Sequence, residues 1–228
     1  FRFGNPTVDD WEGKVNAWPL DEGLIDYIAA DHGGNDENPF STANVIANAS
    51  LTIGGEAVDA GQITPALLES LHEVEGIEAN VATGYHAIEF LLWGQDLYKL
   101  GAGRRGHEDY VVGSVANAQR RGEYLLVVSE LLIKDLNYLV SAWSKGNPSN
   151  YRAEFLALPS EKSLQNIFKG IVFMSGDELS GERMYVAYDT RGQEDEHSCF
   201  SDNTHRDVRL NLAGIANVYR GSYGSVDG

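Results

Sequence analysis

The sequence predicts an all-α protein with two helical-bundle-like domains and a loop-rich N-terminal third. Apolar residues recur at helical spacing over several long stretches, and no alternation of strand period lasts long enough to support a sheet. Gly, Asn, Asp and Pro crowd residues 1–60, which is typical of ordered loops with short helices. With 228 residues, 43% of them hydrophobic, the chain is long and apolar enough to form a packed core.

Three helices are predicted in the first hundred residues. A short one is expected over residues 20–30. Thr64 and Pro65 supply an N-cap and a proline at the first helical position, which predicts a helix continuing through residues 66–74. From Ala79 to Leu97, apolar residues recur at mixed three- and four-residue intervals, as in a helix that is buried on much of its circumference.

Three longer helices are predicted in the remainder of the chain. Residues 110–143 have helical periodicity without proline, and Gly146-Asn147-Pro148 ends the pattern. A second helix is expected from Ser160 to about Val186. A third begins at Asn203 or Thr204, both of which are good N-caps, and runs through Val218. These helices predict a bundle in the C-terminal half.

The Gly-rich segment 101–106 interrupts the pattern where the charge balance also changes. We therefore expect an N-terminal helical domain over residues 1–105 and a C-terminal helical-bundle domain over residues 106–228. Residues 1–100 contain 17 acidic and 3 basic side chains and account for −14 of the formal net charge of −17. Such acidity repels nucleic acid and anionic membrane surfaces, whereas it concentrates cations around the first half.

Two further features limit the kinds of site that the chain can form. Cys199 is the single cysteine, which excludes an intrachain disulfide and any multi-cysteine zinc or iron–sulfur site. No stretch approaches the roughly 18 consecutive apolar residues of a transmembrane span. The chain also begins at Phe1 without a signal-peptide pattern, which suggests a trimmed form.

The main chemical motif is the pair His86 and Glu89 within an apolar helix. Residues three apart project from one face of a helix, so the two side chains can share one metal ion or one proton. An unpaired carboxylate among Ile88, Phe90 and Leu91 would be costly, so Glu89 needs a partner. On spacing alone, a purely structural ion pair between His86 and Glu89 is the favoured interpretation.

A second cluster of candidate ligands lies between residues 193 and 207. Either of two pairs with suitable spacing, Glu194 with His197 and Asp202 with His205, could ligate a divalent metal. The alternative is a capped loop in which Asp207 complements the dipole of the following helix. The two H-x-x-E and E-x-x-H patterns only weakly suggest a di-iron bundle, because the first has reversed order and the second sits in a loop.

The stretch GYHAIEFLLWGQD over residues 84–96 resembles the imelysin family of bacteria through its G-x-H-x-x-E signature. This family comprises the insulin-cleaving membrane peptidase group and its iron-regulated relatives, which are related to the periplasmic component of a ferrous-iron uptake system. The resemblance extends along the chain, over residues 1–6, 10–13, 18–23, 181–184 and 193–205.

The resemblance implies an exported protein of the periplasm or outer membrane, whose signal sequence is not present in this chain. Its expected ligand is a divalent or ferric ion, iron or zinc, and its expected partners are an iron-transport component or a peptide substrate. His86 and Glu89 become the leading metal ligands, with Gly84 allowing close packing beside them. Additional ligands are expected among the following residues: Asp21, Glu22, Glu194, Glu196, His197, Asp202 and His205.

Two other functions remain open from the sequence. In a zinc-dependent peptidase, His86 would help hold the metal, and Glu89 would act as a ligand or as general base on a bound water. The H-E-x-x-H motif of many metallopeptidases is absent. In a binding module for a non-metal ligand, His86 and Glu89 would form a structural pair, and a direct hydrogen bond between them without metal would favour this function.

Overall fold

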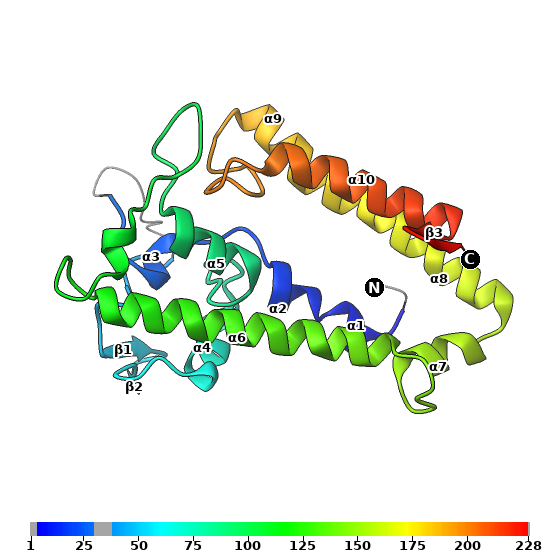
Figure 1. Ribbon diagram of the computed structural model, residues 1–228, viewed down its shortest axis with the longest axis horizontal. Helices are drawn as coiled ribbons and strands as arrows, with labels where there is room; N and C mark the ends of the chain where they lie inside the picture. Colours follow the sequence, from blue (N-terminus) through cyan, green and yellow to red (C-terminus); the bar gives the residue numbers. More distant parts are fainter. Residues whose placement is uncertain (1–3, 30–37, 228) are drawn as a thin grey trace. The chain divides into compact units, whose positions relative to one another are not determined.

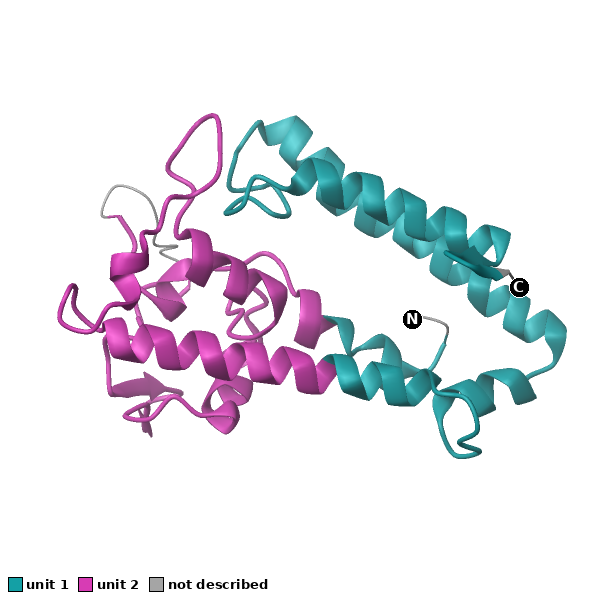
Figure 2. Ribbon diagram, viewed as in Figure 1, with its two compact units in different colours: residues 1–12, 136–228 teal, residues 13–135 magenta. Residues whose placement is uncertain are grey.

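The computed structural model describes residues 4–29 and 38–227, and it is mostly helical (Figure 1). It confirms the predicted fold class, with the addition of two short β-hairpins. The chain forms two compact units (Figure 2): unit 1 contains residues 1–12 and 136–228, and unit 2 contains residues 13–135. Residues 1–3 of the family-like N-terminal stretch lie outside the described residues.

These units divide the chain differently from the predicted boundary at residues 105 and 106. The Gly-rich segment 101–106 lies within unit 2, where Arg105 forms an ion pair with Asp26. The helix α6 (Ala118–Trp143) supplies residues to both units. The Gly-rich segment is therefore a loop inside unit 2 and not a boundary between the units. The ion pair between Arg105 and Asp26 connects this loop to the earlier part of the same unit.

Unit 2 consists of short elements around the first two-thirds of α6. In chain order these are α2 (Glu12–Asn16, whose first residue belongs to unit 1), α3 (Glu22–Ile25), β1 (Ser50–Ile53), β2 (Glu56–Asp59), α4 (Pro65–Leu71), the 3₁₀ turn η1 (Val74–Gly76), α5 (Gly84–Trp93) and the 3₁₀ turn η2 (His107–Tyr110). Strands β1 and β2 pair antiparallel, with Ser50 opposite Asp59.

Local sequence explains two of these elements directly. The side chain of Thr64 accepts a hydrogen bond from the Leu67 amide at 3.2 Å, so α4 begins as predicted. Gly54 and Gly55 join β1 to β2, and both have positive φ, as a two-residue hairpin turn with the twist of the strands requires. Periodicity did not predict this hairpin because each of its strands has only four residues.

A buried ion network replaces the second half of the helix expected over residues 20–30. Asp26 adopts an extended conformation that ends α3 at Ile25. Its carboxylate accepts from Arg121 Nε and Nη2 at 2.7 and 3.0 Å and from Arg105 Nη1 at 2.6 Å. Asp109 joins the network through Arg105 Nη1 at 3.1 Å and the Tyr27 hydroxyl at 2.8 Å. Tertiary pairing at Asp26 therefore overrides local helix formation.

Unit 1 consists of α1 and a chain of helices from residue 151 onward, together with the end of α6. The elements are α1 (Pro6–Asp9), α7 (Tyr151–Ala157), α8 (Ser160–Phe173), the π-helix η3 (Met174–Tyr185), α9 (Val186–Thr190), α10 (Thr204–Arg220), β3 (Ser222–Tyr223) and β4 (Val226–Asp227). The predicted helix over residues 160–186 is confirmed as a helical stretch, although its second half is a π-helix. The helix predicted from Thr204 is α10.

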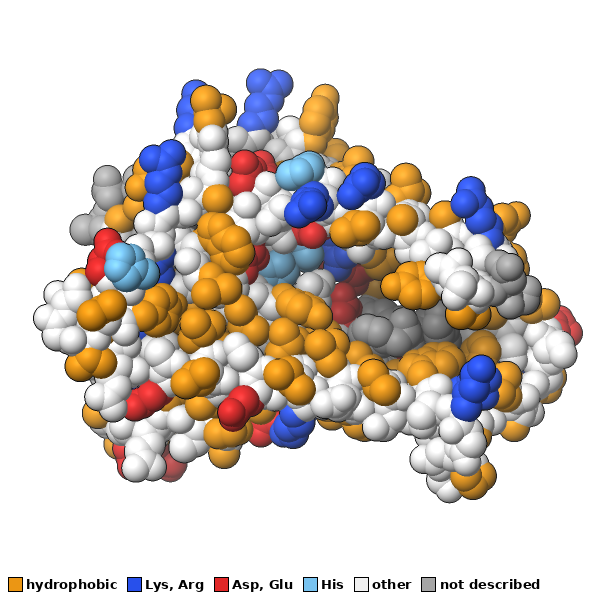
Figure 3. Space-filling view, viewed as in Figure 1, with side chains coloured by type: hydrophobic (Ala, Val, Ile, Leu, Met, Phe, Trp, Pro, Cys, Tyr) orange, Lys and Arg blue, Asp and Glu red, His pale blue; other side chains and the backbone are white. Residues whose placement is uncertain are grey.

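Apolar side chains are more exposed in unit 1 than its helical pattern predicts. None of the residues of α10, all of which are described, is buried, and Leu210 and Leu212 are 58% and 61% exposed. A small buried cluster of Val8, Ala142 and Tyr151 packs α1 and α7 against the end of α6. On the face seen in Figure 3, hydrophobic side chains also gather along α6. None of the helices in the described ranges has both the length and the apolar composition of a membrane span.

Candidate functional site

The predicted pair His86 and Glu89 lies on α5 in the interior of unit 2. Both residues are buried, with exposed fractions of 2% and 8%. The Nδ1 atom of His86 lies 2.9 Å from Oε2 of Glu89, which is a direct hydrogen bond between the side chains. The helical spacing therefore brings the two groups together as predicted. This contact has the geometry of a structural pair, and it also fixes the orientation of the imidazole.

Gly84 allows the first turn of α5 to approach α2 closely. A Cβ atom at this position would lie 2.8 Å from the carbonyl oxygen of Val15 and 3.2 Å from that of Lys14. Gly84 also has a φ of +86°, a conformation that other residues adopt at an energetic cost. The glycine of the G-x-H-x-x-E signature thus brings His86 beside the chain segment that follows α2.

That segment contributes an aromatic neighbour to the pair. The indole ring of Trp18 packs on the imidazole of His86, with ring centroids 4.9 Å apart and planes inclined at 55°. Trp18 was not among the predicted ligands, although it belongs to the family-like stretch 18–23. An indole beside the imidazole limits the access of water to one side of His86 and restricts rotation of the ring.

Asp21 and Glu22, the predicted additional ligands of this half, lie at the start of α3 in the same unit. Asp21 caps the helix, because its Oδ1 accepts from the Gly23 amide at 3.3 Å. Its Oδ2 accepts from Asn38 Nδ2 at 2.9 Å. Burial raises the pKa of Asp21, and the hydrogen bonds from Asn38 and Gly23 oppose that rise. Both carboxylate oxygens of Asp21 thus accept hydrogen bonds. Glu22 is also buried, with an exposed fraction of 9%.

The second predicted cluster lies in unit 1, between α9 and the start of α10. His197 is buried and places Nδ1 3.0 Å from Oδ2 of Asp207, a residue that was not predicted as a ligand. The hydroxyl of Ser198 donates to the same carboxylate oxygen, and Thr204 Oγ1 accepts from the Ser198 amide at 3.0 Å. Asp207 occupies the first turn of α10, as the capped-loop alternative predicts, although Asn203 at the N-cap makes no side-chain cap hydrogen bond.

The other predicted ligands of this cluster lie around that contact. Asp202 adopts a left-handed conformation with a φ of +55° and is exposed, as is His205. Glu194 and Glu196 belong to the loop that precedes His197. Over residues 4–29 and 38–227, the structure contains no group of three or more His, Cys, Asp or Glu side chains arranged to hold a metal.

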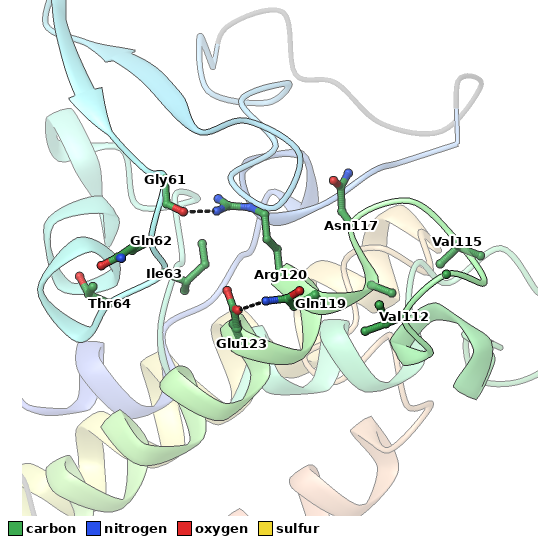
Figure 4. Close-up of a pocket in the computed structure, with 12 residues that line it drawn as sticks. Gly61, Gln62, Ile63, Thr64, Val112, Val115, Asn117, Gln119, Arg120 and Glu123 are labelled. Atoms are coloured by element: carbon green, nitrogen blue, oxygen red, sulfur yellow. Dashed lines mark hydrogen bonds between the residues drawn. The ribbon is translucent and has the colours of Figure 1, made fainter.

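A polar pocket of about 650 Å³ lies elsewhere in unit 2, at the N-terminal end of α6 (Figure 4). It is lined by residues 61–64, by Val112, Gly113 and Val115, and by residues 117–120 and Glu123, so it includes none of the predicted site residues. The guanidinium of Arg120 donates to the carbonyl oxygens of Val45, Ile46, Ala60 and Gly61 at 2.6–2.9 Å. The guanidinium of Arg120 therefore links the backbone of residues 45–46 to that of residues 60–61.

One known protein family matches the chain over its full length. The family model described as Imelysin matches residues 1–228, and no curated protein matches the chain. The match includes the α5 signature with its hydrogen-bonded His86 and Glu89, the Trp18 segment and the loop around His197. The chain belongs to the imelysin family.

Proposed function

We propose that this protein captures a divalent or ferric metal ion, iron above all, at the His86–Glu89 pair, in iron uptake or iron-regulated metabolism. The observation that supports this most is the family match over the whole chain, within whose signature His86 and Glu89 are buried side by side on α5. The direct 2.9 Å hydrogen bond between His86 Nδ1 and Glu89 Oε2 is also the contact that a structural pair or a non-metal binding module would make, so the proposal rests on the family match. Under this proposal the protein is exported and works in the periplasm or at the outer membrane, beside an iron-transport component.

The hydrogen bond assigns different roles to the two side chains. Metal-binding histidines commonly donate one ring N–H to a carboxylate, which fixes the tautomer and makes the other ring nitrogen a better ligand. With Nδ1 directed at Glu89, Nε2 is the nitrogen of His86 that would meet the ion. Glu89 would then orient and polarise the imidazole. The net charge of −14 over residues 1–100 favours the approach of a cation.

The donor set fits a weakly held cargo ion better than a fully enclosed cofactor. An imidazole nitrogen and a carboxylate oxygen suit iron and zinc. Two donors leave coordination positions for water or for small ligands that arrive with the ion. Asp21 and Glu22 are the proposed further ligands from unit 2, and the carboxylate of Asp21 also caps α3 and accepts from Asn38. The loop around His197 in unit 1 is a candidate for a metal site of its own.

The family model also favours a second candidate, a zinc-dependent peptidase at the same pair. In that case zinc would polarise the scissile carbonyl or a bound water, and Glu89 would accept the proton of that water. Catalytic zinc sites normally use three protein ligands and keep a fourth position open. With Glu89 acting as the base, the peptidase therefore needs two protein ligands in addition to His86.

Calorimetric titration of the protein with ferrous iron, ferric citrate, zinc and copper tests the first proposal. The H86A variant is expected to lose at least a hundredfold in affinity, and E89Q about tenfold, since the amide only weakens the orientation of the ring. The matched control is the exposed pair His107 and Glu108, whose Nδ1 and Oε2 atoms lie 3.2 Å apart. The H107A/E108A variant should bind as the unmodified protein does.

An unchanged affinity in the H86A/E89A double variant would overturn the metal proposal. Incubation of the zinc-loaded protein with an unfolded protein substrate tests the peptidase. Cleavage that E89Q abolishes and H107A/E108A preserves would favour that activity, whereas the absence of cleavage would leave metal capture as the function.

A further inference from the structure

His72, at the C-terminal end of α4, bridges two segments that are far apart in sequence. Its Nε2 lies 2.8 Å from the carbonyl oxygen of Gly13, and its Nδ1 accepts a hydrogen bond from the Ala82 amide at 3.3 Å. An acceptor Nδ1 and a carbonyl partner for Nε2 together require the neutral imidazole with its proton on Nε2. The side chain is 12% exposed, and burial lowers its pKa, which is consistent with the neutral form.

Both segments lead directly to the His86–Glu89 pair. Ala82 lies two residues before α5 begins at Gly84, and Gly13 belongs to α2. Just beyond the bridge, the Thr83 hydroxyl approaches the Lys14 carbonyl at 3.4 Å. At the next position Gly84 packs against the Val15 carbonyl, where a Cβ would lie at 2.8 Å. The imidazole of His72 is thus the side-chain link at one end of a close backbone contact between α2 and α5.

The same two segments carry the groups that pack together at the site. Trp18 follows α2, and its ring lies against that of His86, with centroids 4.9 Å apart. Any change in the separation of α2 and the first turn of α5 would move one ring relative to the other. Sub-ångström displacement of a ligand is sufficient to weaken a metal site, because coordination distances are narrowly defined.

We propose that His72 is a positioning residue for the His86–Glu89 pair: by joining the Gly13 carbonyl to the Ala82 amide, its neutral imidazole sets α5 against α2 and so fixes His86 beside Trp18. This inference rests on the proposed function of the pair, but it concerns a residue outside the G-x-H-x-x-E signature. Three charged groups on neighbouring elements act on the His72 imidazole: Lys14 of α2, Glu73 after α4 and Asp135 of α6.

The experiment compares three variants in the metal-free protein and then with zinc. H72F keeps a planar ring but removes both hydrogen bonds, H72Q supplies one amide that can both donate and accept, and L68V trims a fully buried side chain of the same helix without touching the bridge. Long-range ¹H–¹⁵N spectra report the two ring nitrogens of each histidine, and calorimetry reports zinc affinity. Urea unfolding shows which variants have lost comparable stability.

In H72F we expect the ring-nitrogen signals of His86 to shift and the zinc affinity to fall about tenfold, as for other outer partners of metal ligands. H72Q should restore most of both properties, and L68V should leave the His86 signals in place. Unchanged His86 signals in H72F, or an equal shift in L68V, would overturn the inference. If the unmodified protein binds none of the four ions of the calorimetric titration, the proposed function fails, while the His86 signals still decide whether His72 positions the pair.

A measurement on the unmodified protein covers the case in which H72F does not fold. The bridge requires His72 to carry its proton on Nε2, with Nδ1 unprotonated at neutral pH. The two ¹⁵N shifts of His72 identify the tautomer directly. The expected result is an unprotonated Nδ1, and observation of the opposite tautomer would refute the bridge and the inference with it.

Discussion

Units 1 and 2 differ in how much of their helical surface is buried. In α5 of unit 2, six residues of ten are buried, among them Phe90 and Leu91, which have no exposed surface. In α10 of unit 1, all 17 residues are described and none is buried. The apolar residues of α5 recur around much of the helix, as its burial requires, whereas the periodicity of α10 does not reveal whether its apolar residues are covered. Burial concentrates in unit 2, and the His86–Glu89 pair lies there.

The largest expected loss of stability comes from a change in the buried ion network of unit 2. Asp26 is 2% exposed and pairs with both Arg105 and Arg121. In a D26N variant Arg105 would keep its ion pair with Asp109, whereas Arg121 would lose its carboxylate partner and remain a buried cation. Removing one partner of a buried ion pair costs about 3–5 kcal/mol. We expect urea unfolding to show this loss in D26N. E56Q, at an exposed position of β2, is the control and should unfold as the unmodified protein does.

A D26N variant with unaltered stability would mean that the network contributes little to unit 2. The two guanidinium groups would then have found other acceptors, and hydrogen exchange of the amides around Asp109 would show whether the loop had rearranged.

A pair of identical truncations compares the two units directly. Leu91 on α5 has no exposed surface, so L91A should lower the free energy of unfolding by about 2–5 kcal/mol. Leu210 on α10 is 58% exposed, so L210A should change it by less than about 0.5 kcal/mol. Unfolding curves of the two variants measure the difference. If L210A proves as costly as L91A, the α10 surface is covered in solution.

A smaller effect of opposite sign is expected at Asp135, a buried carboxylate in unit 2. Its Oδ1 has no hydrogen-bond partner within the described part of the chain. Burial raises the pKa of Asp135, and the positive charges of Lys14 and Lys134 oppose that rise. An unsatisfied buried acceptor costs about 1–3 kcal/mol, so D135L should be more stable by that amount at pH 7.

The pH dependence of this gain follows from the direction of the pKa shift. A carboxyl whose pKa is higher in the folded protein destabilises the fold above that pKa, and the penalty vanishes once both states are protonated in acid. The stability advantage of D135L should therefore shrink as the pH falls from 7 toward the ordinary carboxyl pKa. The E130L variant, at an exposed position of α6, should show no such trend, and a pH-independent advantage in D135L would contradict the assignment.

The smallest expected effect comes from two ion pairs that have the same length but differ in burial. Lys134 Nζ and Glu69 Oε1 lie 2.6 Å apart, the same distance as between Arg105 Nη1 and Asp26 Oδ2. The first pair is exposed to solvent and the second is almost fully buried. Exposed ion pairs gain little because water and salt screen them. The K134A variant should unfold at the same urea concentration as the unmodified protein, whereas D26N should unfold at a lower one.

The sequence predicts elements whose determinants are local. The Thr64–Pro65 cap, the start of α10 and the shared helix face of His86 and Glu89 depend on residues within a few positions of one another. The bond between Asp26 and Arg121 joins positions 95 residues apart, and the partner of His197 is Asp207 rather than a residue at helical spacing. Trp18 and His72 are outside the reach of spacing arguments for the same reason, because their roles depend on tertiary contacts. The Gly54–Gly55 turn was a local signal for a hairpin that periodicity alone did not detect.

The π-helix of unit 1 also affects how the chain tolerates changes of length. In a π-helix each backbone bond spans one residue more than in an α-helix, so the ladder over Met174–Tyr185 holds extra residues per turn. Removing a single residue from this stretch would let the following bonds close as α-helical ones. Deletion of one residue between His86 and Glu89 in α5 would rotate the side chain of Glu89 away from that of His86 by about 100°. Length variation between related chains is therefore expected to accumulate in the π-helical stretch and to be absent between residues 84 and 93.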